Sequence, residues 1–129
     1  MNTPPTLSTN LQMIATLIPE GVKMLDIGCA KGNLLSWLAE HKNVRGRGIE
    51  ICKDKVQEAI TRGLSVVQGD AEEDLAHYQE SAYDYIVLNQ ILQQMNDPVA
   101  VLTHAARVAK NIIVSVPNFG HWRNRWYLA

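Results

Sequence analysis

The residues with the clearest potential for chemistry lie in one short run, from Val22 to Gly32. An apolar stretch there ends in an acid, Asp26, and small residues follow at every second position from Gly28. Because glycine has no Cβ, the backbone at Gly28 and Gly32 can adopt unusual φ angles, and a ligand can lie directly against it. A helical pattern begins at Asn33, so this ligand would face the N-terminus of a helix. The run predicts a strand, a tight turn and a helix that together bind a nucleotide-like ligand.

The spacing of the small residues distinguishes two classes of nucleotide site. Dinucleotide-binding folds use the order Gly-x-Gly-x-x-Gly, with the pyrophosphate at the helix N-terminus. This chain has Asp-x-Gly-x-Ala-x-Gly over residues 26–32, which resembles the class I S-adenosylmethionine (SAM) methyltransferases. It departs from their pattern at Ala30, where glycine is usual, and at Lys31, which brings a positive charge near the sulfonium of SAM. The alternative interpretation is an ordinary glycine-rich turn that binds no ligand.

Two further acids follow apolar stretches later in the chain. Glu50 comes about twenty residues after the glycine turn, where dinucleotide folds place a ribose-binding acid. A carboxylate there can accept both hydrogen bonds of a ribose 2′,3′-diol, and a solvated strand end is the alternative. Asp70 also follows a strand pattern, and the resemblance to SAM enzymes implies that it accepts a hydrogen bond from the adenine amino group. Capping of the next helix is a rival role for Asp70, and the two roles are compatible.

The predicted cofactor site combines the turn, the two acids and their neighbours. Asn89 belongs to it because it ends a fourth apolar run, at the edge where the transferred methyl group would be met. Amides do not titrate, so neither Asn89 nor Gln90 can act as a general base, and no catalytic residue is assigned. The residues predicted to bind SAM are Asp26, Gly28, Cys29, Ala30, Gly32, Glu50, Ile51, Asp70, Ala71 and Asn89.

The composition is that of an ordinary globular domain. The chain has 129 residues, of which 47% are hydrophobic and 19% charged, and its formal net charge is −1. Bulk charge therefore gives no reason to expect nucleic acid or an anionic membrane as a partner. No apolar run approaches the ~20 residues of a membrane span, and the first residues lack a signal-peptide pattern, which predicts a cytoplasmic protein. Cys29 and Cys52 have no metal-ligand spacing, so we expect free thiols and no metal site.

Strand and helix patterns alternate along the chain. The predicted strands cover residues 23–27, 44–50, 64–68, 81–89 and 111–116, and the predicted helices cover 11–18, 33–40, 53–62, 72–78 and a segment that starts near Asp97. Such alternation implies a parallel sheet with right-handed crossovers. This alternation predicts one α/β domain over residues 1–129 with helices on both faces, and the resemblance to class I methyltransferases implies their Rossmann-like fold with strand order 3-2-1-4-5.

Five segments together resemble the MetW family of methionine biosynthesis, namely residues 26–32, 48–50, 68–70, 83–93 and 117–122. The glycine turn and the acids are common to class I methyltransferases, whereas Asn-Gln-Ile-Leu-Gln at 89–93 and Asn-Phe-Gly-His-Trp at 118–122 indicate this family. The resemblance covers nearly the whole chain. It implies a SAM-binding fold and homoserine O-acyltransferase as a partner.

Two functions remain open after this resemblance. One is an accessory protein that acts with the acyltransferase, and the other is a freestanding SAM-dependent small-molecule methyltransferase. Asn89 and Gln90 are not followed by the proline-aromatic pair of amino-directed methyltransferases, and no insertion is large enough for a substrate lid. These features favour the accessory role, and a NAD(P)-binding module is disfavoured by the glycine spacing.

The end of the chain carries a separate expectation. Class I methyltransferase sheets usually continue after strand five into an antiparallel hairpin, and this sequence ends at Ala129. We therefore expect a C-terminally truncated domain that lacks the hairpin strands and leaves strand five as an edge. Residues 112–116 of that strand are uncharged and mostly β-branched, a composition that favours pairing with another chain. Self-association or docking of a partner on strand five would follow.

Overall fold

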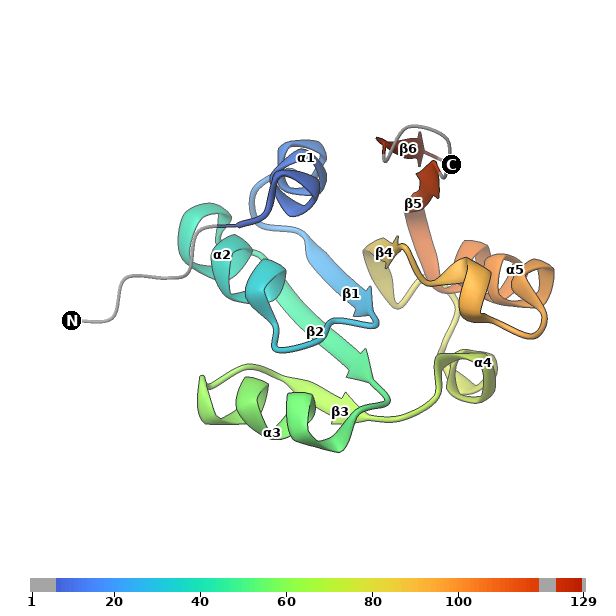
Figure 1. The fold of residues 1–129 in the computed structure, drawn as a ribbon, viewed down its shortest axis with the longest axis horizontal. Coiled ribbons are helices and arrows are strands. Elements are labelled where there is room, and N and C mark those ends of the chain that lie inside the picture. The colour runs from blue at the N-terminus through green and yellow to red at the C-terminus, as the bar shows by residue number, and fades with distance from the viewer. Residues whose placement is uncertain (1–6, 119–122, 129) are drawn as a thin grey trace.

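The structure is a computed structural model that describes residues 7–118 and 123–128 (Figure 1). Its strands are β1 (Lys23–Ile27), β2 (Arg45–Glu50), β3 (Val66–Gln68), β4 (Tyr83–Asn89), β5 (Ala109–Asn118) and β6 (Arg123–Leu128). Its helices are α1 (Thr9–Leu17), α2 (Asn33–Lys42), α3 (Lys53–Thr61), α4 (Ala71–Asp74) and α5 (Pro98–Val108), with the short 3₁₀ helices η1 (Leu75–His77) and η2 (Leu92–Gln94). The elements from α1 to β5 alternate as predicted, with bounds that differ by one or two residues.

The strands form one sheet in the order β3-β2-β1-β4-β5-β6. The first five strands in this order are parallel, which confirms the predicted order 3-2-1-4-5. Asp26 of β1 lies between Gly48 of β2 and Val87 of β4 in the register. The chain moves outward from β1 to β2 and β3 and then returns to the other side of β1 with β4. This reversal leaves a crevice at the carboxyl ends of β1 and β4, where open α/β sheets bind ligands.

Strand β6 corrects the expectation that strand five is an edge. It runs antiparallel to β5, with Leu128 opposite Ile113 and Arg123 opposite Asn118, and Figure 1 shows the two strands side by side. A strand of six residues is enough for this pairing, so a returning strand fits before Ala129. Strand β5 is therefore not an edge, and the reason to expect self-association through it no longer holds. Most of the family segment 118–122 lies outside the described residues.

The helices cover both faces of the sheet, and each face has its own core. Helices α1, α2 and α3 pack on one face, where Met24 and Val87 are buried. Helices α4, η1 and α5 pack on the other face, where Leu25 and Ile86 are buried. Neighbouring residues of β1 and of β4 thus point to opposite cores, as expected for strands covered on both sides. The apolar spacing of Val56, Ala59 and Ile60 predicts that all three face the core, but only the first two are buried and Ile60 is 55% exposed.

Local signals set the helix ends that border the site. The Ser8 hydroxyl accepts a hydrogen bond from the N–H of Leu11 at the start of α1, and the Asp97 carboxylate accepts one from Ala100 at the start of α5. Gly63 follows α3 with a φ of +80°, the left-handed conformation that glycine supplies at a helix end. In the described part of the chain, no helix has both the length and the apolar composition needed to cross a membrane.

Candidate functional site

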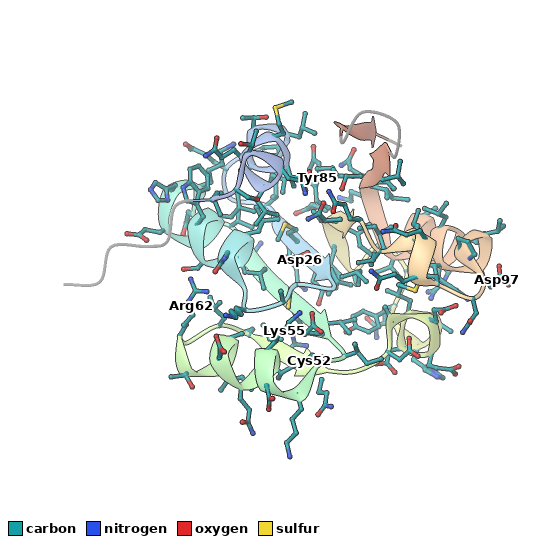
Figure 2. The ribbon with its side chains drawn as sticks, in the orientation of Figure 1. Asp26, Cys52, Lys55, Arg62, Tyr85 and Asp97 are labelled. Carbon is teal, nitrogen blue, oxygen red and sulfur yellow. The ribbon has the colours of Figure 1, made fainter. Side chains whose placement is uncertain are left out.

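The carboxyl ends of β1, β2 and β4 surround a cavity of about 600 Å³. A smaller cavity of about 280 Å³ shares Gly28, Ala30, Lys55 and Asn89 with it, so the two adjoin. Figure 2 shows Asp26, Cys52 and Lys55 close together at this edge. The residues predicted from the sequence that line one or both cavities are Asp26, Gly28, Cys29, Ala30, Glu50, Ile51, Asp70, Ala71 and Asn89. The structure thus brings together every predicted residue except Gly32.

The turn between β1 and α2 has a left-handed backbone at every second residue. The φ angle is +72° at Gly28, +53° at Ala30 and +86° at Gly32. An L-residue in this region costs roughly 1–2 kcal/mol, so Ala30 carries backbone strain that a glycine would not. The N–H groups of Gly28 and Cys29 donate to the carbonyl of Ile49 at 2.8 and 3.3 Å. These bonds attach the turn to β2.

Gly28 is required by a contact as well as by its φ angle. A Cβ at this position would lie 2.9 Å from Cγ2 of Ile91, and Ile91 also lines the larger cavity. From the sequence, the free space at Gly28 is expected to serve a ligand alone. The structure adds Ile91 as a neighbour that any side chain at position 28 would displace.

Gly32 has a packing role and lines neither cavity. It caps the N-terminus of α2 with a left-handed backbone, and a Cβ there would overlap Leu64. Gly48 also has a packing role on β2, because a Cβ would overlap the thiol of Cys29.

Burial, followed by the charges of Asp26 and Glu50, raises the pKa of Cys29 to about 12. This thiol therefore stays protonated and unreactive at neutral pH.

Both cysteines are free thiols, as expected from the sequence. Over residues 7–118 and 123–128, no group of three or more His, Cys, Asp or Glu side chains is arranged to hold a metal ion.

Glu50 holds the glycine turn in place. Its Oε1 accepts a hydrogen bond from the N–H of Ala30 at 2.9 Å, and its Oε2 accepts one from the N–H of Cys52 at 2.8 Å. The side chain is buried, so the interpretation of a solvated strand end is wrong. Each carboxylate oxygen has a second lone pair. Glu50 can therefore keep both backbone bonds and still accept hydrogen bonds from the cavity.

Asp26 is a buried carboxylate whose ionised form is destabilised by the fold. Burial first, and then the charge of Glu50, raise the pKa of Asp26 from 3.8 to about 7. Hydrogen bonds to an ionised carboxylate would lower its pKa, and none from the described residues contributes here. Asp26 lines the smaller cavity. A cation placed there would relieve the cost of ionising it.

The remaining predicted residues lie around the larger cavity in different roles. The Asp70 carboxylate accepts a hydrogen bond from the N–H of Glu72 at 3.0 Å, so its helix-capping role is confirmed, and Asp70 also lines the cavity. Ala71 is buried behind it, whereas the side chain of Ile51 is 67% exposed at the cavity mouth. Ile51 thus offers an apolar surface to a ligand.

Two residues that the sequence analysis missed orient Asn89. Its Oδ1 accepts hydrogen bonds from Nδ2 of Asn10, at 2.7 Å, and from Oγ of Ser115. With Oδ1 occupied by two donors, the Asn89 Nδ2 is the group left to donate into the cavities. Ser115 is fully buried within the otherwise apolar stretch 112–116 of β5, and a lone hydroxyl residue in an apolar run is a signal that sequence reasoning can use. Asn10 carries no comparable signal, since it is 79 positions away in the chain.

The lysines near the turn differ in where their charges lie. Lys31 pairs with Glu58 at 3.5 Å in an exposed ion pair, so its charge is partly balanced on the surface of the molecule. Lys55 lines both cavities and was not predicted. A sequence signal for Lys55 does exist. The helix that contains Lys55 starts at residue 53, directly after the acid Glu50, so the first turn of this helix lies beside the site.

The comparisons with solved structures define the class of fold. The phosphoethanolamine N-methyltransferase 2 of Haemonchus contortus, solved with SAM, superposes with a TM-score of 0.74 at 18% identity over 83% of this chain and 27% of that one. A SAM-dependent methyltransferase from Archaeoglobus fulgidus superposes with a TM-score of 0.71 at 20% identity over 84% of this chain and 53% of that one. The fold is that of the class I SAM-dependent methyltransferases.

The sequence comparisons identify the family within that class. The family model described as methionine biosynthesis protein MetW matches residues 8–129. The chain belongs to this family. A bifunctional methionine biosynthesis protein MetXA/MetW of Rhodopirellula baltica is 29% identical over 90% of this chain, and the match covers 20% of that protein. A ubiquinone biosynthesis O-methyltransferase of Xanthomonas oryzae is 33% identical over 70% of this chain and 39% of its own length. The chain thus spans less than half of either relative.

Proposed function

We propose that this chain binds SAM at the carboxyl edge of its sheet and acts with a homoserine O-acyltransferase in methionine biosynthesis. The observation that carries the cofactor assignment is the grouping of Asp26, Glu50 and the left-handed turn around two adjoining cavities. Their volumes of about 600 and 280 Å³ suit a ligand of this size, since small-molecule pockets measure roughly 300–1,000 Å³. The class of fold supports the same cofactor.

The polar groups at the site complement those of SAM. An ammonium group suits Asp26, because a cation relieves the desolvation that raises the pKa of this carboxyl group. A ribose diol suits the unused lone pairs of Glu50, and the adenine amino group suits Asp70, which lies at the same cavity. The Nδ2 of Asn89 is left to donate, because Oδ1 already accepts two hydrogen bonds. An acceptor such as the methionyl carboxylate fits there.

Bound SAM would supply an electrophilic methyl group on its sulfonium. Transfer of that group depends chiefly on positioning, so a methyltransferase needs no general base. The exposed side chain of Ile51 and the cavity wall formed by Ile91 and Met95 would exclude water from the ligand. These features serve SAM binding equally well in an enzyme and in a binding protein.

The partner is inferred from the Rhodopirellula baltica relative, whose name joins MetXA and MetW in one bifunctional protein. The match covers 20% of that protein, which leaves most of it for the other function. Parts of one process that are fused in one species are often separate, associating chains in another. We therefore assign the acyltransferase as the partner of this chain.

A second candidate function is a freestanding small-molecule methyltransferase. The observation that favours it is the 33% identity to the ubiquinone biosynthesis O-methyltransferase of Xanthomonas oryzae. That match covers only 39% of the relative, so it leaves the acceptor-binding part of that enzyme unmatched. The accessory role is therefore our first proposal.

Calorimetric titration with SAM and with S-adenosylhomocysteine, in the presence and absence of a homoserine O-acyltransferase, tests both parts of the proposal. We expect saturable binding of at least one ligand and faster acyl transfer when this chain is present. A chain that binds neither ligand would overturn the cofactor assignment. Methyl transfer to a small molecule by the isolated chain, with no effect on acyl transfer, would establish the second candidate instead.

A further inference from the structure

A separate cavity lies at the opposite edge of the sheet, near the amino ends of β1 and β2, with a volume of about 540 Å³. We call it the amino-edge cavity, and the residues that line it are Lys23, Leu35, Ala39, Val44, Arg45, Gly46, Arg47, Gly63, Leu64, Ser65 and Tyr83. It shares no lining residue with the cavities at the carboxyl edge. A ligand in the amino-edge cavity would therefore not compete with one at the glycine turn.

The cavity exists because β3 is shorter than β2. Strand β3 begins at Val66, which pairs with Gly48, and the N–H of Gly48 donates to the carbonyl of Ser65 at 2.9 Å. In the described residues, the amino half of β2 pairs with β1 only. Residues 45–47 thus border an open edge of the sheet.

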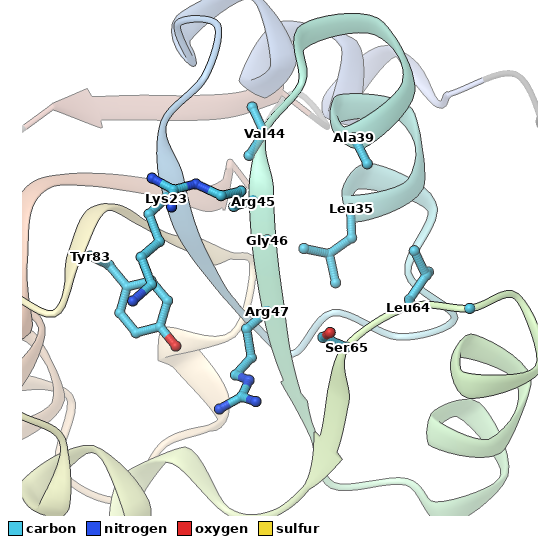
Figure 3. A pocket seen from close by; sticks show the side chains of 11 residues that line it. Lys23, Leu35, Ala39, Val44, Arg45, Gly46, Arg47, Leu64, Ser65 and Tyr83 are labelled. Carbon is cyan, nitrogen blue, oxygen red and sulfur yellow. The ribbon is translucent and has the colours of Figure 1, made fainter.

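The charged side chains of this cavity are all cationic. Lys23, Arg45 and Arg47 line it, and no acidic residue does. Figure 3 shows Lys23 and Arg47 on the same side of β2 as Tyr83. The Lys23 ammonium lies 5.1 Å from the centre of the Tyr83 ring, a cation–π contact that holds the lysine without neutralising it.

Asp84 is an acid on β4 near this group, and its carboxylate already has other partners. One oxygen accepts a hydrogen bond from the backbone N–H of Lys23 at 2.9 Å, and the other lies 3.8 Å from Nζ of Lys110. The ion pairs found among the described residues include none to the side chains of Lys23, Arg45 or Arg47. Three positive charges thus line one concave surface, and like charges along a cleft raise its positive potential.

We propose that the amino-edge cavity binds a small molecule that carries a phosphate or diphosphate group. A single carboxylate would balance one of the three cations, whereas a multiply charged anion balances most of them. The planar forks of two arginines match phosphate oxygens in a bidentate manner.

The test uses pyrophosphate as the probe and follows the backbone amides of the full-length, ¹⁵N-labelled chain by NMR. We expect saturable shifts at Gly46, Gly63 and Ser65, and we expect them to persist when S-adenosylhomocysteine is in excess. Arg47→Gln should weaken pyrophosphate binding at least about fivefold, the order of effect of losing one charged hydrogen-bond partner. Lys53→Gln removes one positive charge from a residue outside the cavities and should leave affinity unchanged.

Three results would overturn the proposal. Equal weakening by Arg47→Gln and Lys53→Gln would mean that pyrophosphate responds only to overall charge. Shifts at Gly28 and Gly32 that S-adenosylhomocysteine abolishes would place the anion at the carboxyl edge. Tighter binding of an octaglutamate peptide than of pyrophosphate at the same amides would make the cavity a docking site for an acidic protein segment. Thermal melting of both variants shows that they are folded before the titrations are compared.

Discussion

Two carboxylates define the chemistry of the carboxyl edge, and the fold treats them differently. Glu50 receives hydrogen bonds from two backbone N–H groups, one from Ala30 and one from Cys52. Burial and the charge of Glu50 raise the pKa of Asp26. Glu50 is thus a structural clamp that also faces the cavity. The ionised form of Asp26 is destabilised by its buried position, and a cationic ligand would stabilise it.

Asp26→Asn is expected to raise stability at pH 8 more than at pH 5. The pKa of Asp26 rises from 3.8 to about 7 on folding, so the folded state binds this proton more tightly than the unfolded chain does. The contribution to stability is therefore fully present below about pH 4 and is lost as the pH rises to about 7. Asparagine avoids that loss, which is on the order of 2–4 kcal/mol. Urea unfolding of both proteins at the two pH values measures it, and an identical pH dependence in both would contradict the prediction.

Glu50→Gln is expected to weaken SAM binding roughly ten- to a hundredfold, which corresponds to about 1.5–3 kcal/mol. An amide has one oxygen, so either Ala30 or Cys52 also loses its acceptor, and the melting temperature should fall. Glu40→Gln on the exposed side of α2 is the matched control and should change neither quantity. Titrations at a temperature where circular dichroism shows folded protein separate binding from stability. Equal affinity in the variant and the natural chain would refute the ribose assignment.

At the scale of elements, the turn between β1 and α2 and the pairing of β5 with β6 decide the shape of the molecule. The turn places Gly28 against Ile91, so the strand-to-helix connection and the segment after β4 form one wall. Strand β6 covers the outer side of β5. Both features join segments that are separate in the sequence.

Gly28→Val is expected to abolish SAM binding, because valine disfavours a φ of +72° and its Cβ would meet Ile91 at 2.9 Å. Gly21→Val is a well-matched control. Gly21 has a φ of +74° and nothing within 4 Å of an added Cβ, so this variant has similar backbone strain without the contact. Calorimetry with SAM compares the two. Normal binding by Gly28→Val would mean that the turn is not the cofactor site.

Hydrogen exchange is expected to show β5 amides protected on both sides of the strand. Those that do not donate to β4 should donate to β6, because the register pairs Val114 with Tyr127 and Ser115 with Trp126. Their protection should approach that of Ile86 and Val87 in β4, and the chain should elute in size-exclusion chromatography independently of concentration. Removal of residues 119–129 should lower the protection of β5. Rapid exchange of β5 amides in the full chain would show that β6 does not pair.

At the scale of the whole molecule, one sheet carries cavities at both of its edges. The carboxyl edge contains buried acids and a left-handed turn, whereas the amino edge gathers cations. Strand β2 contributes to both, with Arg45 and Arg47 at one end and Glu50 at the other. The molecule thus offers separate places for a cofactor and for an anionic ligand.

S-adenosylhomocysteine at a hundred times its Kd is expected to raise the melting temperature by roughly 8–13 °C. Ligand in that excess stabilises the folded state by about 2.7 kcal/mol, and a domain of this size gains about 3–5 °C per kcal/mol. NAD at the same concentration should give no shift, because the glycine spacing differs from that of dinucleotide sites. A larger shift with NAD would reverse the choice of cofactor.

The sequence by itself determined the order of the elements and the strand order of the sheet. It also placed Asp26, Glu50 and Asn89 at the same edge of the sheet. These features follow from local patterns, since an apolar run, the glycine turn that follows it and the next helical stretch each specify their own backbone. Once strands and helices alternate, handed crossovers leave few possible topologies. The resemblance to class I methyltransferases then selected one strand order from the remaining topologies and SAM as the cofactor.

Only the tertiary structure decided which distant residues meet. The contact of Asn10 with Asn89, the position of Ile91 beside Gly28 and the exposure of Ile60 depend on how separate elements pack. The return of the chain as β6 and the gathering of cations at the amino edge also arise between distant segments. Side-chain contacts across a fold depend on distances and angles between elements, and a local pattern specifies neither. Burial likewise raises the pKa of Asp26 only after both layers of helices are in place.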